Sequence, residues 1–234
     1  EKGGQILKNF IFDICKCESN WRPSDFIQDA INEIRRIVGN GNAIIALSGG
    51  IDSSTAALLA SRAIGNKLIA VFVDHGFMRE GEVEEIRKVF ENSGINLTIA
   101  DAKKQFLENI KGVRDPEEKR KIVGREFIKV FEDAASKVKA KYLIQGTIYP
   151  DRIESGFRKQ SDTIKTHHNV GGIPNKIKFE KIIEPLRDLY KDEVKEVAKN
   201  IGLSEKIVNR PPFPGPALAV RIIGEVTEKK LQII

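Results

Sequence analysis

Serine, glycine and aspartate side chains crowd into residues 48–54, which follow an apolar run and precede a helix-forming stretch. Two adjacent glycines allow the backbone to turn with positive φ and to come close to a ligand. A helix that begins after such a turn presents unpaired N–H groups and the positive end of its dipole to an anion. The pattern therefore predicts a phosphate-binding loop at the end of a strand. Its candidate ligands are Ser48, Gly49, Gly50, Asp52, Ser53 and Ser54.

Asp52 indicates which kind of phosphate loop this is. The stretch lacks the spacing and the lysine of a Walker loop, and it also lacks the spaced glycines of a dinucleotide fingerprint. A carboxylate inside an anion cradle repels phosphate unless a cation lies between them, so we expect Asp52 to bind a Mg²⁺ ion that bridges to the phosphates. The alternative is an ordinary strand, glycine turn and helix whose serines only cap the helix.

The composition is typical of a globular protein with one main domain and additional segments, since the 234 residues are 41% hydrophobic and 31% charged. No apolar run approaches the roughly 18 residues that a membrane helix needs, and the first residues do not resemble a signal peptide, so a cytoplasmic protein without membrane contact is expected. The net charge of +6 is interleaved with acidic residues, which favours a small anionic substrate over nucleic acid. Cys15 and Cys17 are too close for a structural disulfide and lack two further zinc ligands.

Strands and helices alternate along the chain, which predicts a doubly wound parallel α/β sheet of about five strands. Apolar spacing predicts strands over 43–47, 68–73, 97–100, 142–144 and 182–183, and helices over 25–38, 53–64, 82–93, 103–110, 116–138 and 191–201. Ligands of such sheets bind at the carboxyl ends of the strands. The polar residues that follow the first, second and fourth strands are therefore expected to converge in one crevice. The long polar connection 155–178 is expected to form a lid.

Seven segments make the chain resemble the ATP pyrophosphatase domain of the GMP synthetase family, whose fold is adenine nucleotide alpha-hydrolase-like. They lie at 48–54, 71–79, 112–120, 145–155, 164–174, 184–194 and 212–221, and the similarity extends from Trp21 to Val226. The first segment is shared with NAD synthetases, asparagine synthetases and tRNA-thiolating enzymes, whereas the last five together are specific to the family. Ile51 replaces a valine without consequence. Ala217 stands where a glycine is expected, which bears on a backbone turn near the substrate.

This resemblance implies GMP synthesis. Xanthosine monophosphate would attack the α-phosphate of ATP through its purine 2-oxygen, pyrophosphate would leave, and ammonia would displace AMP. The adenylylation step gathers negative charge on phosphates, so it needs Mg²⁺ and cationic donors rather than a covalent nucleophile. ATP and Mg²⁺ are the implied cofactors.

The resemblance also assigns roles around the nucleotide. Ser48, Gly50, Asp52, Ser53 and Ser54 would hold the phosphates that leave as pyrophosphate. The turn from Val73 to Phe77 would line the adenine and ribose pocket, and Gln145 and Gly146 would bind the nucleotide after the fourth strand. Arg114 and Arg120 are candidate phosphate contacts, and the alternative is that they belong to a solvated helix start.

The catalytic candidates are Asp151, Glu154 and Lys165. Asp151 and Glu154 are three residues apart and so share a helical face, where both would direct adenylylation and Asp151 would bind metal, unless they are a solvated acidic pair. Lys165, His167 and His168 would close over the nucleotide as the lid, and because adjacent histidines on a strand point different ways, only one is expected to touch phosphate. Pro214, Gly215 and Arg221 would border the xanthylate, unless the proline-rich stretch is a rigid linker.

The chain is expected to divide into three segments. Residues 1–20 resemble the end of an upstream amidotransferase domain and a linker, residues 21–221 would form the ATP pyrophosphatase domain, and residues 222–234 would begin a truncated dimerisation domain. No G-x-C-x-G nucleophile segment occurs, so ammonia would come from a glutamine amidotransferase domain or subunit. A homodimer is expected when the C-terminal domain is present, and the 234 residues alone are expected to turn over poorly.

Three other functions are weighed against this one. An NAD synthetase would need a nicotinate dinucleotide site, and the segment at 164–174 is not typical of it. An RNA-binding or thiolating module fits the basic net charge but would need appended RNA-binding elements. The third is a regulatory nucleotide-binding fragment without catalysis.

Overall fold

The computed structural model describes residues 2–91, 93–156, 179–211, 213 and 215–233, with the side chains of 154–156 outside this description. Its centre is a five-stranded sheet in the order β3-β2-β1-β4-β5, in which every neighbouring pair is parallel. The strands are β1 (Ala43–Leu47), β2 (Leu68–Asp74), β3 (Asn96–Asp101), β4 (Tyr142–Ile144) and β5 (Lys181–Ile183). The predicted doubly wound parallel sheet is therefore confirmed.

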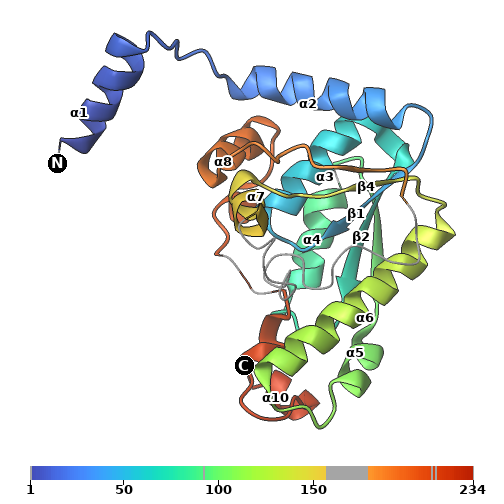
Figure 1. Ribbon diagram of the computed structural model, residues 1–234. Helices are drawn as coiled ribbons and strands as arrows, with labels where there is room; N and C mark the ends of the chain where they lie inside the picture. The colour runs from blue at the N-terminus through green and yellow to red at the C-terminus, as the bar shows by residue number, and fades with distance from the viewer. Residues whose placement is uncertain (1, 92, 157–178, 212, 214, 234) are drawn as a thin grey trace.

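Helices cover both faces of the sheet (Figure 1). One face packs against α2 (Pro23–Val38), α3 (Ile51–Ile64), α4 (Glu82–Glu91) and α8 (Lys191–Asn200), and the other packs against α5 (Lys103–Asn109) and α6 (Pro116–Lys137). Successive residues of a strand point to opposite faces, so Ile45 belongs to the first core and Ile44 to the second. Burial on both faces explains why β1, and β2 up to Val73, consist of apolar residues.

The predicted helices all begin and end within two residues of the observed bounds. The difference that matters for function is in α3, which begins at Ile51 rather than at the expected Ser53, because Gly50 serves as its N-cap residue. Further short elements are η2 (Gly65–Lys67), α7 (Tyr149–Gly156), α9 (Glu205–Val208), the 3₁₀-helix η3 (Ala217–Val220) and α10 (Glu228–Leu231). Helices of this length carry too few turns for apolar spacing to reveal them.

The N-terminal helices stand away from the sheet (Figure 1). Helix α1 (Gly3–Lys8) and the π-helix η1 (Asn9–Ile14) bury none of their residues, and the large apolar side chains of Ile6, Phe10 and Ile14 are exposed. The expected boundary near residue 20 stays a prediction. In the part of the chain that the structure describes, every helix is too short or too polar to cross a membrane.

Ala217 adopts the left-handed backbone conformation that usually requires glycine. Its φ is +53°, and its side chain is fully buried at the start of η3. A Cβ atom in this region crowds the following carbonyl group at a cost of about 1–2 kcal/mol. Ala217, which stands where a glycine is expected, therefore has a strained backbone conformation.

We expect Ala217→Gly to be far better tolerated than the matched change Ala219→Gly. Both methyl groups are fully buried in η3, so both changes lose the same burial, but only the first relieves left-handed strain. The free energy of unfolding, measured in urea, should be higher for Ala217→Gly than for Ala219→Gly by about 1–2 kcal/mol. Equal losses in the two variants would show that position 217 carries no strain.

Candidate functional site

The turn after β1 forms an anion cradle at the start of α3. Gly49 has φ +75°, and α3 begins after Gly50 without a side-chain cap. The hydroxyl oxygens of Ser48 and Ser53 are 3.0 Å apart, and the Ser53 hydroxyl accepts from the Ser48 N–H at 3.2 Å. These two side chains close the turn, while the uncapped helix start directs N–H groups and its dipole toward an anion.

Asp52 is paired with Lys191, the first residue of α8. Its Oδ1 and Oδ2 lie 2.8 Å and 2.6 Å from the Lys191 Nζ. The Asp52 side chain is 28% exposed and the Lys191 side chain 46% exposed, so both can exchange partners with a ligand. Sequence reasoning included Lys191 in a family segment but gave it no role, because it lies 139 positions from Asp52.

Arg210 holds the glycine turn in place. Its guanidinium donates to the Gly49 carbonyl at 3.1 Å and pairs with Glu82 at 2.7 Å. Glu82 is only 3% exposed and Arg210 13% exposed, and an added Cβ on Gly49 would lie 3.1 Å from the Arg210 guanidinium. Gly49 is therefore required both for its positive φ and for this close approach. No sequence signal had pointed to Arg210.

Ser54 differs from the other predicted cradle residues. Its side chain is fully buried, and its Oγ is a buried polar atom without a hydrogen-bond partner among the described residues. In this conformation the hydroxyl is shielded from the crevice, in contrast to the exposed Ser48. The assignment of Ser54 to phosphate binding stays a prediction.

Gln145 and Gly146 bring the end of β4 against the cradle. The Gln145 N–H donates to the Ile183 carbonyl at 2.9 Å, which continues the pairing of β4 with β5. An added Cβ on Gly146 would lie 2.8 Å from both the carbonyl carbon of Asp52 and the nitrogen of Ser53. The contact lies between β1 and β4, where the strand order reverses and where doubly wound sheets bind their ligands.

Asp151 lies in the first turn of α7. Its Oδ2 accepts from the Ile148 N–H at 3.0 Å, so it stabilises the start of its own helix. Arg152, the next residue, pairs with Asp188 in the segment before α8, which fastens α7 to the element that carries Lys191 (Figure 1). Metal binding by Asp151 stays a prediction. Within the described ranges, no three His, Cys, Asp or Glu residues gather as a metal site.

Several candidates lie outside the described residues. They are Lys165, His167 and His168 of the predicted lid, Pro214, and the side chain of Glu154. Their roles stay predictions.

The turn after β2 is built on buried rings. Val73 and Phe77 are each 1% exposed, so a nucleotide at this turn would meet their backbone atoms rather than their side chains. The His75 ring lies 5.4 Å from the Phe77 ring and 5.6 Å from the Phe106 ring, and its Nδ1 accepts from the Phe77 N–H at 3.1 Å. Burial lowers the pKa of His75 to about 4, although the Asp74 carboxylate acts in the opposite direction. His75 is therefore neutral near pH 7.

We expect this histidine to make the protein less stable in mild acid. The folded state keeps His75 neutral down to about pH 4, whereas an unfolded chain protonates histidine near pH 6.5. The unfolded state binds more protons between these values, so the free energy of unfolding should fall by up to about 3 kcal/mol as the pH drops from about 6.5 to about 4.

Urea unfolding across this pH range measures the effect. The control is His75→Asn, which keeps an acceptor near the Nδ1 position and does not titrate. In this variant the free energy of unfolding should no longer fall between about pH 6.5 and about pH 4 because of this residue. If the free energy of unfolding depends on pH as in the wild type, the role of His75 is contradicted.

Two segments distant in sequence meet near the predicted xanthylate site. The Leu218 N–H donates to the Phe77 carbonyl at 2.9 Å. The guanidinium groups of Arg79 and Arg221 lie 4.7 Å and 4.9 Å from the centre of the Phe213 ring. Arg221 and Arg79 therefore both lie against the Phe213 ring, and the exposed Gly215 lies in the same segment as Phe213. A xanthylate contact for either residue stays a prediction.

The predicted arginines at the start of α6 have different surroundings. Arg114 is exposed, whereas Arg120 is paired with Glu117 on its own helix. Between them, the fully buried Lys119 donates to the Ile222 carbonyl at 2.7 Å. The start of α6 is therefore attached to the residue after Arg221. Phosphate binding by Arg114 and Arg120 stays a prediction.

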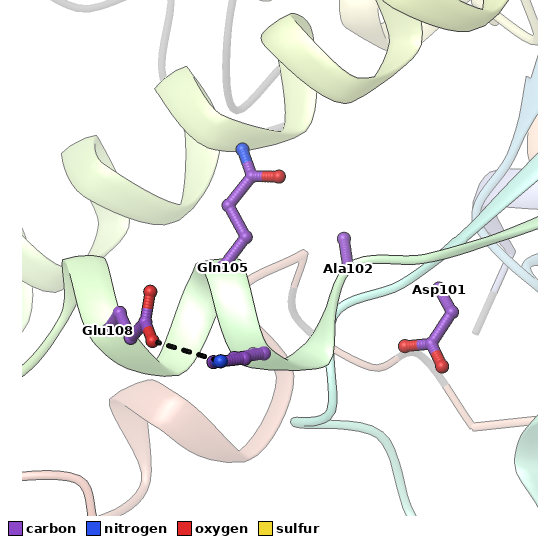
Figure 2. Close-up of a pocket in the computed structure, with 5 residues that line it drawn as sticks. Asp101, Ala102, Gln105 and Glu108 are labelled. Atoms are coloured by element: carbon purple, nitrogen blue, oxygen red, sulfur yellow. Dashed lines mark ion pairs between the residues drawn. The ribbon is translucent and has the colours of Figure 1, made fainter.

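A polar depression lies at the start of α5, away from the cradle residues. It is lined by Asp101, Ala102, Lys104, Gln105 and Glu108 (Figure 2). Gln105 extends toward α6, where it donates to Glu126 at 2.9 Å, and Lys104 pairs with Glu108 at 4.0 Å. The lining residues include none of the predicted ligands, so the candidate site is the cradle at the end of β1.

Known proteins resemble this chain both in sequence and in fold. A family model described as NAD synthase matches residues 22–147, which is more than half of the chain and includes the cradle. The chain belongs to the NAD synthase family. Within that family it is similar along its whole length to glutamine-hydrolyzing GMP synthases: it is 58% identical to that of Caldicellulosiruptor saccharolyticus and 54% identical to that of Thermotoga petrophila. The predicted resemblance is confirmed.

This NAD synthase family chain spans about half the length of those relatives, covering 46% and 47% of them. Its fold matches that of solved structures. NMN synthetase from Francisella tularensis aligns with a TM-score of 0.66 at 18% identity, covering 90% of this chain and 82% of that one. The NH3-dependent NAD synthetase from Campylobacter jejuni aligns with a TM-score of 0.63 at 17% identity, covering 81% and 78%. At such identities the likeness concerns the fold alone, and it confirms the predicted fold class.

Proposed function

We propose that the 234 residues form the ATP pyrophosphatase part of a GMP synthase, a carbon–nitrogen ligase that forms AMP and pyrophosphate. The observation that carries the proposal is the cradle at the end of β1. An uncapped helix start, two serine hydroxyls and the Asp52–Lys191 pair meet at the place where the strand order reverses. That combination fits a magnesium-bound polyphosphate, and the 58% identity to a GMP synthase supports the choice of reaction.

The residues at the cradle fit Mg²⁺. This ion is usually held by one or two carboxylates together with substrate phosphates, and Asp52 offers a partly exposed carboxylate beside the expected phosphates. When bound, Mg²⁺ supplies charge neutralisation on the phosphate oxygens. An ion held largely by phosphates does not need three protein ligands, and no such cluster occurs in the part of the chain that the structure describes.

The chain's own residues would bind the phosphates of the nucleotide and orient them for the reaction. Ser48, Ser53 and the N–H groups at the start of α3 would hold the departing pyrophosphate, and Lys191 would add a positive charge. The 2-oxygen of xanthosine monophosphate would then displace pyrophosphate from the α-phosphate, and ammonia would replace AMP. Holding the departing group in a fixed cradle stabilises the charge that develops on it.

The partners belong to this proposal as well. Xanthosine monophosphate is the substrate, and a glutamine amidotransferase domain or subunit supplies ammonia. Assembly as a homodimer through a C-terminal domain, and a cytoplasmic location, stay predictions.

Substrate-dependent pyrophosphate release tests the proposal. The assay uses ATP, Mg²⁺ and ammonia with a protein as long as the relatives, and adds either xanthosine monophosphate or deamido-NAD. Release should depend on xanthosine monophosphate. Release that depends on deamido-NAD would assign NAD synthesis instead, and failure of both substrates would overturn the ligase.

A further inference from the structure

The pairing of Asp52 with Lys191 places an ammonium group where a metal ion would bind. Both carboxylate oxygens of Asp52 lie within 2.8 Å of the same Lys191 nitrogen. A divalent ion that used Asp52 would need at least one of these oxygens. Lysine and metal therefore compete for the same carboxylate edge.

The charges around the pair explain why lysine occupies this position. Asp52 lies in the first turn of α3, and Lys191 begins α8. Each helix start carries a positive partial charge, so the site without phosphate has one carboxylate against one lysine and two dipole ends. The two acids that follow Lys191 in the sequence have other partners. Asp192 pairs with Lys195, and Glu193 accepts a hydrogen bond from the N–H of Tyr190, the N-cap residue of α8. Among the described residues, Asp52 is the carboxylate that pairs with Lys191.

Lys191 is suited to exchange its partner. Its side chain is 46% exposed, and a lysine ammonium is a compact charge on a flexible four-carbon stem. Polyphosphate in the cradle would offer it oxygens with more charge than one carboxylate. A short shift of the ammonium group would then free Asp52.

We propose that Lys191 is the resident counter-ion of the phosphate site. It holds Asp52 in the absence of nucleotide, keeps divalent metal from binding there alone, and moves to phosphate oxygens when metal and nucleotide enter together. The inference deepens the proposed function and rests on it for the identity of the nucleotide. Its first part, competition with metal at Asp52, concerns the protein without nucleotide.

The test is a titration of the 234-residue protein with Mn²⁺ in the absence of nucleotide. Electron paramagnetic resonance measures the concentration of free Mn²⁺ at each step. Removing the ammonium in Lys191→Met should tighten Mn²⁺ binding about three- to fivefold, as expected for loss of a partly exposed charge pair. The gain should disappear in the double variant Lys191→Met, Asp52→Asn. Lys191→Arg should behave like the wild type, and so should the matched control Lys195→Met on the same helix.

A second arm measures the binding of MgATP by calorimetry. Lys191→Met should bind MgATP about tenfold more weakly, because a charged hydrogen bond from lysine to phosphate is lost. Unchanged Mn²⁺ affinity in Lys191→Met, or a gain that persists without Asp52, would overturn the counter-ion role. If the wild type bound no ATP at all, the proposed function would fail, while the Mn²⁺ titration would still decide the competition at Asp52.

Discussion

Changing Asp52 to asparagine is expected to slow pyrophosphate release at least about 100-fold while leaving the fold intact. Asparagine keeps the size of the side chain but removes the charge that would hold Mg²⁺ beside the phosphates. Since the Asp52–Lys191 pair is partly exposed, the free energy of unfolding should change by less than about 1 kcal/mol. Pyrophosphate release is measured with ATP, Mg²⁺, xanthosine monophosphate and ammonia, and stability is measured in urea.

The matched control is Asp192→Asn. This aspartate also lies in the first turn of a helix and also pairs with a lysine, but its side chain is 95% exposed. The same change of charge there should leave the rate at the wild-type level. A rate for Asp52→Asn within about twofold of wild type would refute metal binding through this carboxylate.

Changing Gly146 to alanine is expected to be the most disruptive single-methyl change at the site. The new Cβ would lie 2.8 Å from the backbone of Asp52 and Ser53, and these backbone atoms belong to the cradle and its helix, so they have little room to yield. Overpacking of this kind costs about 1–3 kcal/mol. We expect a loss of at least about 2 kcal/mol in the free energy of unfolding, together with weaker MgATP binding.

The control is Gly4→Ala in α1, where an added Cβ meets nothing within 4 Å. That variant should keep the nucleotide affinity and should not lose more than about 0.5 kcal/mol of stability. A Gly146→Ala protein with native stability and native MgATP affinity would mean that the segment after β4 is not held against the cradle.

The fold was largely predictable because its signals are local. The apolar runs of β1 and β2 and the glycine turn between β1 and α3 are contiguous in the sequence, and alternation of strands and helices restricts the topology. The start of α3 was placed two residues late because Ser53 looks like a cap, whereas the structure uses Gly50.

The site was predictable only in part. The serines, glycines and aspartate of the cradle lie together in sequence, but Lys191 and Arg210 reach it from 139 and 161 positions away, and no local pattern reports such contacts. Burial was also hidden, because a motif shows that Ser54 and Phe77 are present without showing that the packing of α3 and of the aromatic rings encloses their side chains.

The hydrogen bond from Leu218 to the Phe77 carbonyl has an evolutionary consequence. It joins η3 to the turn after β2, so a substitution that shifts one segment shifts the other. Both side chains also lie in the same buried core, so when sequences diverge, changes of size at Phe77 should be accompanied by changes around Leu218. Chimeras that exchange only one of the two segments between relatives should assemble less well than chimeras that inherit both from the same parent.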